Sequence, residues 1–141
     1  MSDGSLGQPA RDDVARRVRE LGLSGRCCTQ IMVQMALDEI GAENPQMVDA
    51  VGALCLGLFS GRTCGALTGG LLAMALRSSA PVDGELCEQL VEWFETEHGS
   101  LECDDLLKGD SMARFTTCPA IVGRTYEESM QLLAARGLLA P

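Results

Sequence analysis

Residues 61–76 read GRTCGALTGGLLAMAL, an apolar stretch with one cysteine and repeated glycines. Thr63 is placed to cap a helix that begins at Cys64, so the sulfur would lie in the first turn, where unpaired N–H groups favour a thiolate. Gly65 and Gly69 share one face of this helix, where another backbone can approach closely. We predict a packing helix whose cysteine is either a reactive sulfur or a small apolar core residue.

The segments on either side carry apolar residues at helical spacing and no convincing strand pattern. Helices are expected at residues 12–21, 24–41, 44–59, 83–98 and 125–136, with a short helical turn at residues 100–109. The expected N-caps include Ser24, Asn44 and Asp83, and short connections favour antiparallel neighbours. The predicted fold class is all-α, a compact bundle of about six helices around the central glycine-rich helix. Residues 1–10 are expected to form a flexible N-terminal tail and residues 11–141 a single helical domain.

The chain has 141 residues, enough for one domain, and a net charge of −9 from 20 acidic and 11 basic side chains. A chain this acidic, without a basic cluster, is poorly suited to nucleic acid, so no nucleic-acid partner is expected. The N-terminal residues lack the apolar core of a signal peptide, and the two apolar runs within residues 48–76 are each too short to span a bilayer. We therefore expect a cytoplasmic location and no membrane insertion.

The seven cysteines are the main chemical signal. In a reducing compartment structural disulfides are not expected, and an odd number of cysteines cannot all pair within one chain. The single histidine, His98, is expected to interact with the end of its helix, so any bound metal would be held mainly by sulfur. Cys55 and Cys87 fall on apolar helical stripes and are assigned to the core. Cys27 and Cys28 are neighbours whose side chains would point about 100° apart on a helix, so they cannot easily serve one site.

The remaining cysteines share a position in the expected structure. Cys28, Cys64 and Cys103 each lie in the first turn of an expected helix. Cys118 lies in a less regular segment before Pro119, which favours an extended conformation for the preceding residue. Three positive helix ends that each supply one sulfur would stabilise an anionic thiolate cluster, and Cys118 would complete a set of four.

The residues around these cysteines also match a named pattern. The matching segments are CTQ at residues 28–30, TCGALTG at residues 63–69, CDDLL at residues 103–107 and the cysteine at position 118. Together they resemble the family named C_GCAxxG_C_C, proteins of about this length, found largely in anaerobic bacteria and archaea, to which redox activity is ascribed. The resemblance implies a four-cysteine redox site whose catalytic, cofactor-binding or metal-binding residues are Cys28, Cys64, Cys103 and Cys118. Cys27 competes with Cys28 for the first position, and a threonine precedes Cys64 where the family name has a glycine.

Three functions remain open for these cysteines. The first is electron transfer or redox sensing through an iron–sulfur cluster held by the four thiolates. The second is thiol/disulfide exchange in which Cys64 attacks and another site cysteine resolves. The third is an interaction module with a structural zinc, or with no metal, whose acidic surface docks a basic partner. A redox partner protein is expected in the first two cases, a homo-oligomer is a further expectation, and the sequence identifies no turnover reaction.

Overall fold

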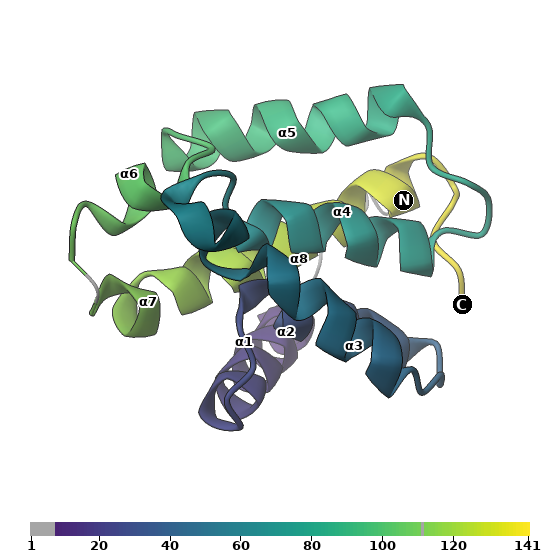
Figure 1. Ribbon diagram of the computed structural model, residues 1–141. Coiled ribbons are helices and arrows are strands. Elements are labelled where there is room, and N and C mark those ends of the chain that lie inside the picture. The colour runs from purple at the N-terminus through teal and green to yellow at the C-terminus, as the bar shows by residue number, and fades with distance from the viewer. Residues whose placement is uncertain (1–7, 111) are drawn as a thin grey trace.

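Helices connected by short loops form the described part of the chain. The computed structural model describes residues 8–110 and 112–141 (Figure 1). The elements in chain order are α1 Gln8–Leu23, α2 Cys28–Glu39, α3 Pro45–Val51, η1 Gly52–Leu54, η2 Gly57–Gly61, α4 Gly65–Arg77, α5 Gly84–His98, α6 Cys103–Leu107, α7 Ala113–Thr116 and α8 Cys118–Ala135. Extended pairing within these ranges is limited to two isolated bridges, so the all-α prediction is confirmed. No helix of the described residues is long and apolar enough to cross a membrane.

Local capping residues decide where two of the helices begin. The Oδ1 atom of Asn44 accepts the Met47 N–H at 3.0 Å, and Pro45 is the first residue of α3. At the start of α5, the Oδ1 atom of Asp83 accepts the Leu86 N–H at 2.8 Å. Both bonds satisfy amides that have no partner inside their own helix. The predicted N-caps at these two positions are confirmed.

The first helix is longer than the sequence predicted. It begins at Gln8 rather than at residue 12, so residues 8–10 of the expected tail are helical, while residues 1–7 lie outside the described part of the chain. Proline is tolerated in a first turn because its missing N–H would have no partner there, so Pro9 does not delay the helix. The predicted apolar face of α1 is confirmed by three buried residues, Val14, Val18 and Leu21.

The second helix is shorter than the sequence predicted. It begins at Cys28 and not near Ser24, which was the expected N-cap. The Ser24 hydroxyl instead donates to the carbonyl of Leu21 at 2.7 Å, so this side chain belongs to the end of α1. Cys27 therefore becomes the N-cap residue of α2.

The glycines of α4 let this helix pack closely against α2. A Cβ atom on Gly69 would lie 2.8 Å from the Cβ of Met32 and 3.1 Å from the Cα of Thr29. A Cβ atom on Gly65 would lie 2.8 Å from Thr29 Oγ1 and 3.4 Å from the Cβ of Cys28. The Thr29 hydroxyl also donates to the Gly65 carbonyl at 3.1 Å across this contact. A side chain at either glycine would push the two helices apart.

α2 and α4 run in the same direction. Their first turns meet at Cys28 and Gly65, and their last turns meet where Arg77 forms an ion pair with Glu39. Arg77 is buried, and the hydroxyl of Tyr126 on α8 donates to Glu39 at 2.6 Å. Polar and charged groups therefore tie α2, α4 and α8 together at one end of the pair, and the opposite end is where α2 and α4 begin.

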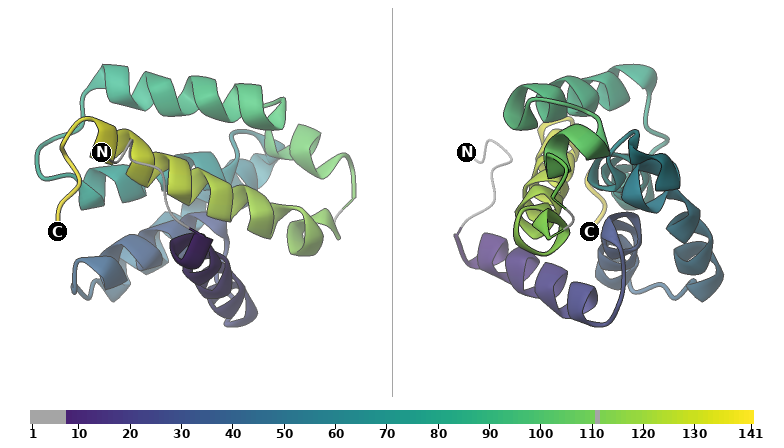
Figure 2. Two further views of the ribbon diagram at one scale, coloured as in Figure 1. Left: turned by 180° about the vertical axis from the view of Figure 1, so that it is seen from behind. Right: turned by 60° about the vertical axis from the view of Figure 1, so that its left-hand side comes forward.

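α5 and α8 pack on further sides of α4. A Cβ atom on Gly70 would lie 2.9 Å from Thr125 Cγ2 on α8 and 3.3 Å from Leu90 Cδ2 on α5, so this glycine lets both helices approach. The predicted inward face of α5 is confirmed by three buried residues, Leu86, Leu90 and Phe94. Figures 1 and 2 show α5 along one side of the molecule and α1 on the opposite side, with α4 and α8 between them.

We expect Gly69→Ala to lower the free energy of unfolding by about 1–3 kcal/mol, because its methyl group would overlap Met32 and separate α4 from α2. Gly22→Ala is the matched control, since Gly22 also lies in a helix but a Cβ atom there would meet no atom within 4 Å. The control should be neutral or stabilising by about 0.5–1 kcal/mol. Urea unfolding followed by circular dichroism measures both variants, and an equal loss in the two would contradict the close α2–α4 contact.

His98, the last residue of α5, packs against aromatic neighbours. Its ring centroid lies 4.6 Å from that of Phe94 and 5.6 Å from that of Trp93. Its Nε2 atom is buried and has no hydrogen-bond partner among the described residues. Burial lowers the pKa of His98 below its ordinary value of 6.5, because the charged form of the ring loses its hydration.

The folded protein therefore holds His98 neutral, and the unfolded chain binds the proton first as the pH falls. We expect the contribution of this group to the free energy of unfolding to be complete above pH 6.5 and to decrease as the pH falls toward the lower pKa of the folded state. His98→Phe should remove this part of the pH dependence while it keeps a ring in contact with Phe94. Urea unfolding between about pH 5 and pH 8 tests this, and identical pH profiles for the two proteins would show that the expectation is wrong.

Candidate four-cysteine site

Each of the four cysteines singled out in the sequence lies at the beginning of a helix. Cys28, Cys103 and Cys118 are the first residues of α2, α6 and α8, and Cys64 is the N-cap residue of α4. Figure 1 shows α6 and α7 at the end of the molecule where α4 and α8 begin. The unpaired N–H groups of several helix ends are therefore directed toward one region.

The four sulfurs lie near one another. The thiol of Cys28 is in hydrogen-bonding contact with Cys118, and Cys64 and Cys103 are close enough to act electrostatically on it. Cys103 and Cys118 act in the same way on Cys64. Cys64 and Cys103 are buried, whereas Cys28 and Cys118 are half-buried. The structure therefore brings together four cysteines that lie far apart in the chain.

A short antiparallel pairing holds Cys64 beside Cys103. Thr63 pairs with Glu102, and the Cys64 N–H donates to the carbonyl of Leu101 at 2.8 Å next to this bridge. Cys64 directly follows Thr63, and Cys103 directly follows Glu102. Because side chains alternate between the two faces of paired extended segments, both cysteine side chains lie on the face opposite to Thr63 and Glu102. Because the backbone of Thr63 takes part in this pairing, Thr63 is not the N-cap of α4, and that prediction is wrong.

Two further predictions near the site are wrong. The short helix α6 begins after Glu102 and not at Ser100, whose Oγ instead accepts the Glu102 N–H at 3.0 Å. The last helix begins at Cys118 and not at Thr125, so Cys118 is helical rather than extended. Pro119 lies in the first turn, where its missing N–H costs no hydrogen bond. The fourth cysteine therefore also lies at a helix N-terminus.

Burial decides the protonation of these thiols. It raises the pKa of Cys64 to about 11, although backbone N–H groups at the start of α4 act in the opposite direction. The hydrogen bond with Cys118, together with burial, raises the pKa of Cys28. Burial, with the nearby Cys118, also raises the pKa of Cys103. The predicted stabilisation of thiolates by helix ends is therefore outweighed at Cys28, Cys64 and Cys103, and burial favours the protonated thiol at these three residues.

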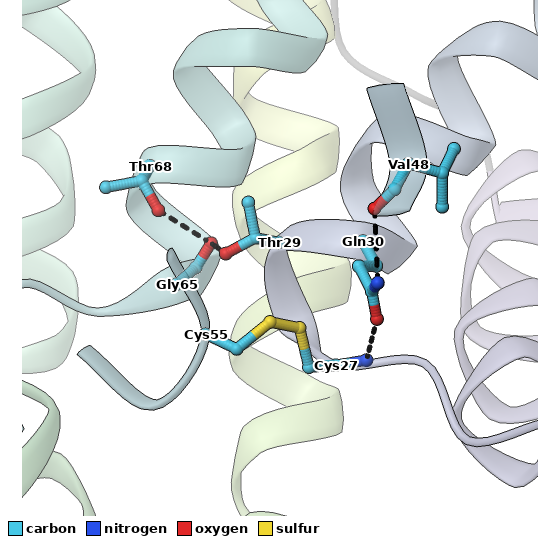
Figure 3. The surroundings of a disulfide bond; sticks show 7 residues. All are labelled: Cys27, Thr29, Gln30, Val48, Cys55, Gly65 and Thr68. Atoms are coloured by element: carbon cyan, nitrogen blue, oxygen red, sulfur yellow. Dashed lines mark hydrogen bonds between the residues drawn. A yellow bond between two sulfur atoms is a disulfide. The ribbon is translucent and has the colours of Figure 1, made fainter. Parts of the chain in front are cut away.

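Cys27, the neighbour of Cys28, has a different partner. It forms a disulfide with Cys55, and their Cα atoms are 6.0 Å apart (Figure 3). The sequence predicted no structural disulfide and assigned Cys55 to the core as a free residue. Cys55 is indeed buried, but it is bonded to Cys27. No local motif marks this pair, because the two residues are 28 positions apart and meet only when α2 folds against the segment after α3.

Residues 56–61, directly after Cys55, do not continue the helix but form a turn with left-handed backbone angles, called the left-handed turn below. α3 ends at Val51, so the prediction of a helix over residues 44–59 is wrong in its last part. Leu56, Leu58 and Phe59 have φ angles of 53°, 62° and 53°. Each non-glycine residue in this conformation costs roughly 1–2 kcal/mol, so contacts elsewhere must hold the turn in place.

The left-handed turn lies directly against Cys103. Gly57 has a φ angle of +61°, and a Cβ atom there would lie 2.7 Å from the Cβ of Cys103. A Cβ atom on Gly61 would meet the carboxylate of Asp104. The turn therefore covers the start of α6, and this close approach depends on glycine at position 57.

Other sites for a ligand are less well supported. Within residues 8–110 and 112–141, no three His, Cys, Asp or Glu side chains are arranged to hold a metal ion. A pocket of about 360 Å³ is lined mainly by residues of α1, α2 and α8 and by no cysteine. Its charged groups pair with one another, Arg17 with Asp38 and Arg77 with Glu39, so it presents no unpaired charge to a ligand.

Comparison with known proteins supports the resemblance noted in the sequence. Residues 26–132 match the family described as "Putative redox-active protein (C_GCAxxG_C_C)". This range covers most of the chain and contains all four cysteines of the site. No curated protein and no solved structure matches the chain.

We expect Gly57→Ala to displace the left-handed turn and expose Cys103, which is only 8% exposed in the folded protein. The same change should lower the free energy of unfolding by about 1–3 kcal/mol, because it adds both a clash and an unfavourable φ angle. Gly41→Ala is the control, since Gly41 also has a positive φ angle but a Cβ atom there meets nothing within 4 Å. Alkylation of metal-free protein, mapped by mass spectrometry, should show faster labelling of Cys103 in Gly57→Ala alone. Equal labelling rates in the two variants would contradict a covering role for the turn.

Proposed function

Because the chain belongs to the C_GCAxxG_C_C family of redox-active proteins, we propose that Cys28, Cys64, Cys103 and Cys118 are its redox-active sulfurs and together hold an iron–sulfur cluster. The protein would then serve electron transfer or redox sensing. The observation that carries this proposal is the gathering of four cysteines outside the disulfide, each from the N-terminal end of a different helix.

The donor set suits an iron–sulfur cluster better than a single metal ion. Iron–sulfur clusters are held by cysteine thiolates, usually four of them, and the chain offers four cysteines outside the disulfide in one region. A single ion draws its ligands to one point, and no three ligand side chains of the described residues have that arrangement. In a cluster, iron and inorganic sulfide lie between the thiolates. The four sulfurs therefore surround the whole cluster and need not converge on one ion. When bound, such a cluster accepts and releases single electrons.

The residues of the chain would have separate tasks at this site. The four sulfurs would be the ligands, and the N–H groups at the helix ends would partly offset their negative charge. The Thr63–Glu102 pairing would fix Cys64 relative to Cys103, and the left-handed turn would keep water from the Cys103 side. α4 would be the helix around which the site is built, since it packs against α2, α5 and α8.

A redox partner would dock at this end of the molecule. Two apolar side chains are exposed there. Phe59 on η2 is 65% exposed, and Met112, the residue before α7, is 61% exposed. Such residues favour a contact with an apolar centre. The net charge of −9 favours a partner with a basic rim, because opposite charges accelerate association.

The contact between Cys28 and Cys118 supports thiol/disulfide exchange as the second candidate function. These two sulfurs are within hydrogen-bonding contact, and both are half-buried, so a disulfide could form between them without moving either helix far. Oxidation would join the two sulfurs and release two electrons and two protons to an external disulfide, which is reduced to two thiols. The raised pKa values of Cys28 and Cys64 count against either thiol as a fast nucleophile at neutral pH.

Iron content separates the two candidates. Protein purified without oxygen should contain iron and sulfide and show the broad visible absorption of an iron–sulfur cluster. Serine substitution of Cys28, Cys64, Cys103 or Cys118 should remove most of the bound iron and the visible absorption. Cys87→Ser is the matched control, because Cys87 is a free, half-buried cysteine on α5 outside the site, and it should keep both.

The opposite outcomes are equally informative. If the protein is colourless and iron-free and gains a Cys28–Cys118 disulfide on mild oxidation, thiol/disulfide exchange is supported and the iron–sulfur cluster is ruled out. Iron-free protein with the same number of titratable thiols before and after oxidation would overturn both candidates.

A further inference from the structure

The Cys27–Cys55 disulfide lies next to the four-cysteine site but uses none of its sulfurs. Cys27 directly precedes Cys28 at the start of α2, and Cys55 directly precedes the left-handed turn over Cys103. The bond thus connects a helix that supplies one site cysteine with a segment that covers another. The proposed cluster uses neither of these two residues.

We propose that Cys27 and Cys55 form a second redox site, a thiol/disulfide couple whose reduction releases the left-handed turn and opens the Cys103 side of the four-cysteine site. This inference does not depend on whether the four-cysteine site binds iron.

The turn is anchored at both of its ends. At one end the disulfide anchors Cys55, which is 3% exposed. At the other end the backbone N–H of Cys103 donates a hydrogen bond to the carbonyl of Arg62, which joins the turn to the pairing beside the site. Between these anchors Leu58 is 43% exposed and Phe59 is 65% exposed, so burial of their side chains contributes little to keep the turn in its left-handed form. Loss of one anchor should therefore let these residues return to ordinary backbone angles.

The surroundings of Cys27 fit it as the sulfur that an external thiolate attacks. Cys27 is half-buried whereas Cys55 is buried, so Cys27 is the more accessible of the two. Cys27 is also the N-cap residue of α2, and Figure 3 shows its N–H donating to Gln30 Oε1, at 3.2 Å.

The reaction balances with a dithiol as the reductant. A thiolate of the dithiol attacks the Cys27 sulfur, the Cys27–Cys55 bond breaks, and Cys55 leaves as a thiolate that takes up a proton. The second thiol of the reductant then attacks the mixed disulfide and releases Cys27. The protein gains two thiols, and the reductant becomes a cyclic or intramolecular disulfide.

Gly57 is the residue through which a movement of the turn would change the four-cysteine site. This residue lies so close to Cys103 that a Cβ atom on it would be 2.7 Å from the Cys103 Cβ. A change in the backbone angles at Gly57 would alter this contact. Reduction of the disulfide should therefore increase the access of solvent and reagents to Cys103.

Limited proteolysis of the full chain tests both parts of the proposal. Chymotrypsin should cleave after Phe59 about tenfold faster once dithiothreitol has reduced the disulfide, as expected when a local opening becomes about 1.4 kcal/mol easier. Phe115 on α7 is an internal control, because it is also 65% exposed but lies in a segment that the disulfide does not touch. Its cleavage rate should not change.

Variants and peptide mapping complete the test. Cys27→Ser/Cys55→Ser should be cleaved after Phe59 at the fast rate with or without dithiothreitol, while Cys87→Ser should behave like the unaltered chain. Mass spectrometry of non-reduced peptides should recover a linked Cys27–Cys55 peptide. Free thiols at both positions before reduction would overturn the proposal, and so would an unchanged rate after Phe59 when mapping shows that the bond has been reduced. Neither result bears on the iron content that tests the four-cysteine site.

Discussion

The close packing of α2 against α4 is the contact on which the rest of the structure depends. It is possible because Gly65 and Gly69 carry no side chain where Thr29 and Met32 approach. Because the two helices run in the same direction, their positive ends lie together, and the cysteines at those ends become neighbours. The Arg77–Glu39 ion pair at the opposite end holds the pair in this register. A bulkier residue on the α4 face would separate the helices and, with them, the sulfurs.

The site balances two opposing influences on its thiols. Helix N-termini favour thiolates, whereas burial and neighbouring sulfurs favour protonated thiols. Burial prevails at Cys64, whose pKa is raised to about 11. Four thiols held this close are therefore not a set of independent nucleophiles. If several of these thiols lose their protons, the resulting thiolates repel one another. Bound cations or sulfur–sulfur bonds would remove this repulsion.

The left-handed turn connects the two groups of cysteines. It begins after Cys55, which is bonded to Cys27, and it ends at the pairing that positions Cys64 and Cys103. Three of its residues other than glycine adopt unfavourable backbone angles, so its anchored ends and its contact with Cys103 must hold it in place. A change at one group of cysteines can therefore be transmitted to the other through a few residues of backbone.

The sequence by itself determined the helical class and the caps at Asn44 and Asp83, because these depend on local hydrogen bonds and apolar spacing. It also predicted which cysteines to group, from short motifs around them. It did not reveal the starts of α2 and α8, since the Ser24 hydroxyl bonds to α1 and Pro119 fits a first turn as readily as a loop. Only the tertiary structure decided the Cys27–Cys55 bond, the left-handed turn and the raised thiol pKa values. Each of these arises from groups distant in the chain that burial brings into contact, and no local pattern records that contact.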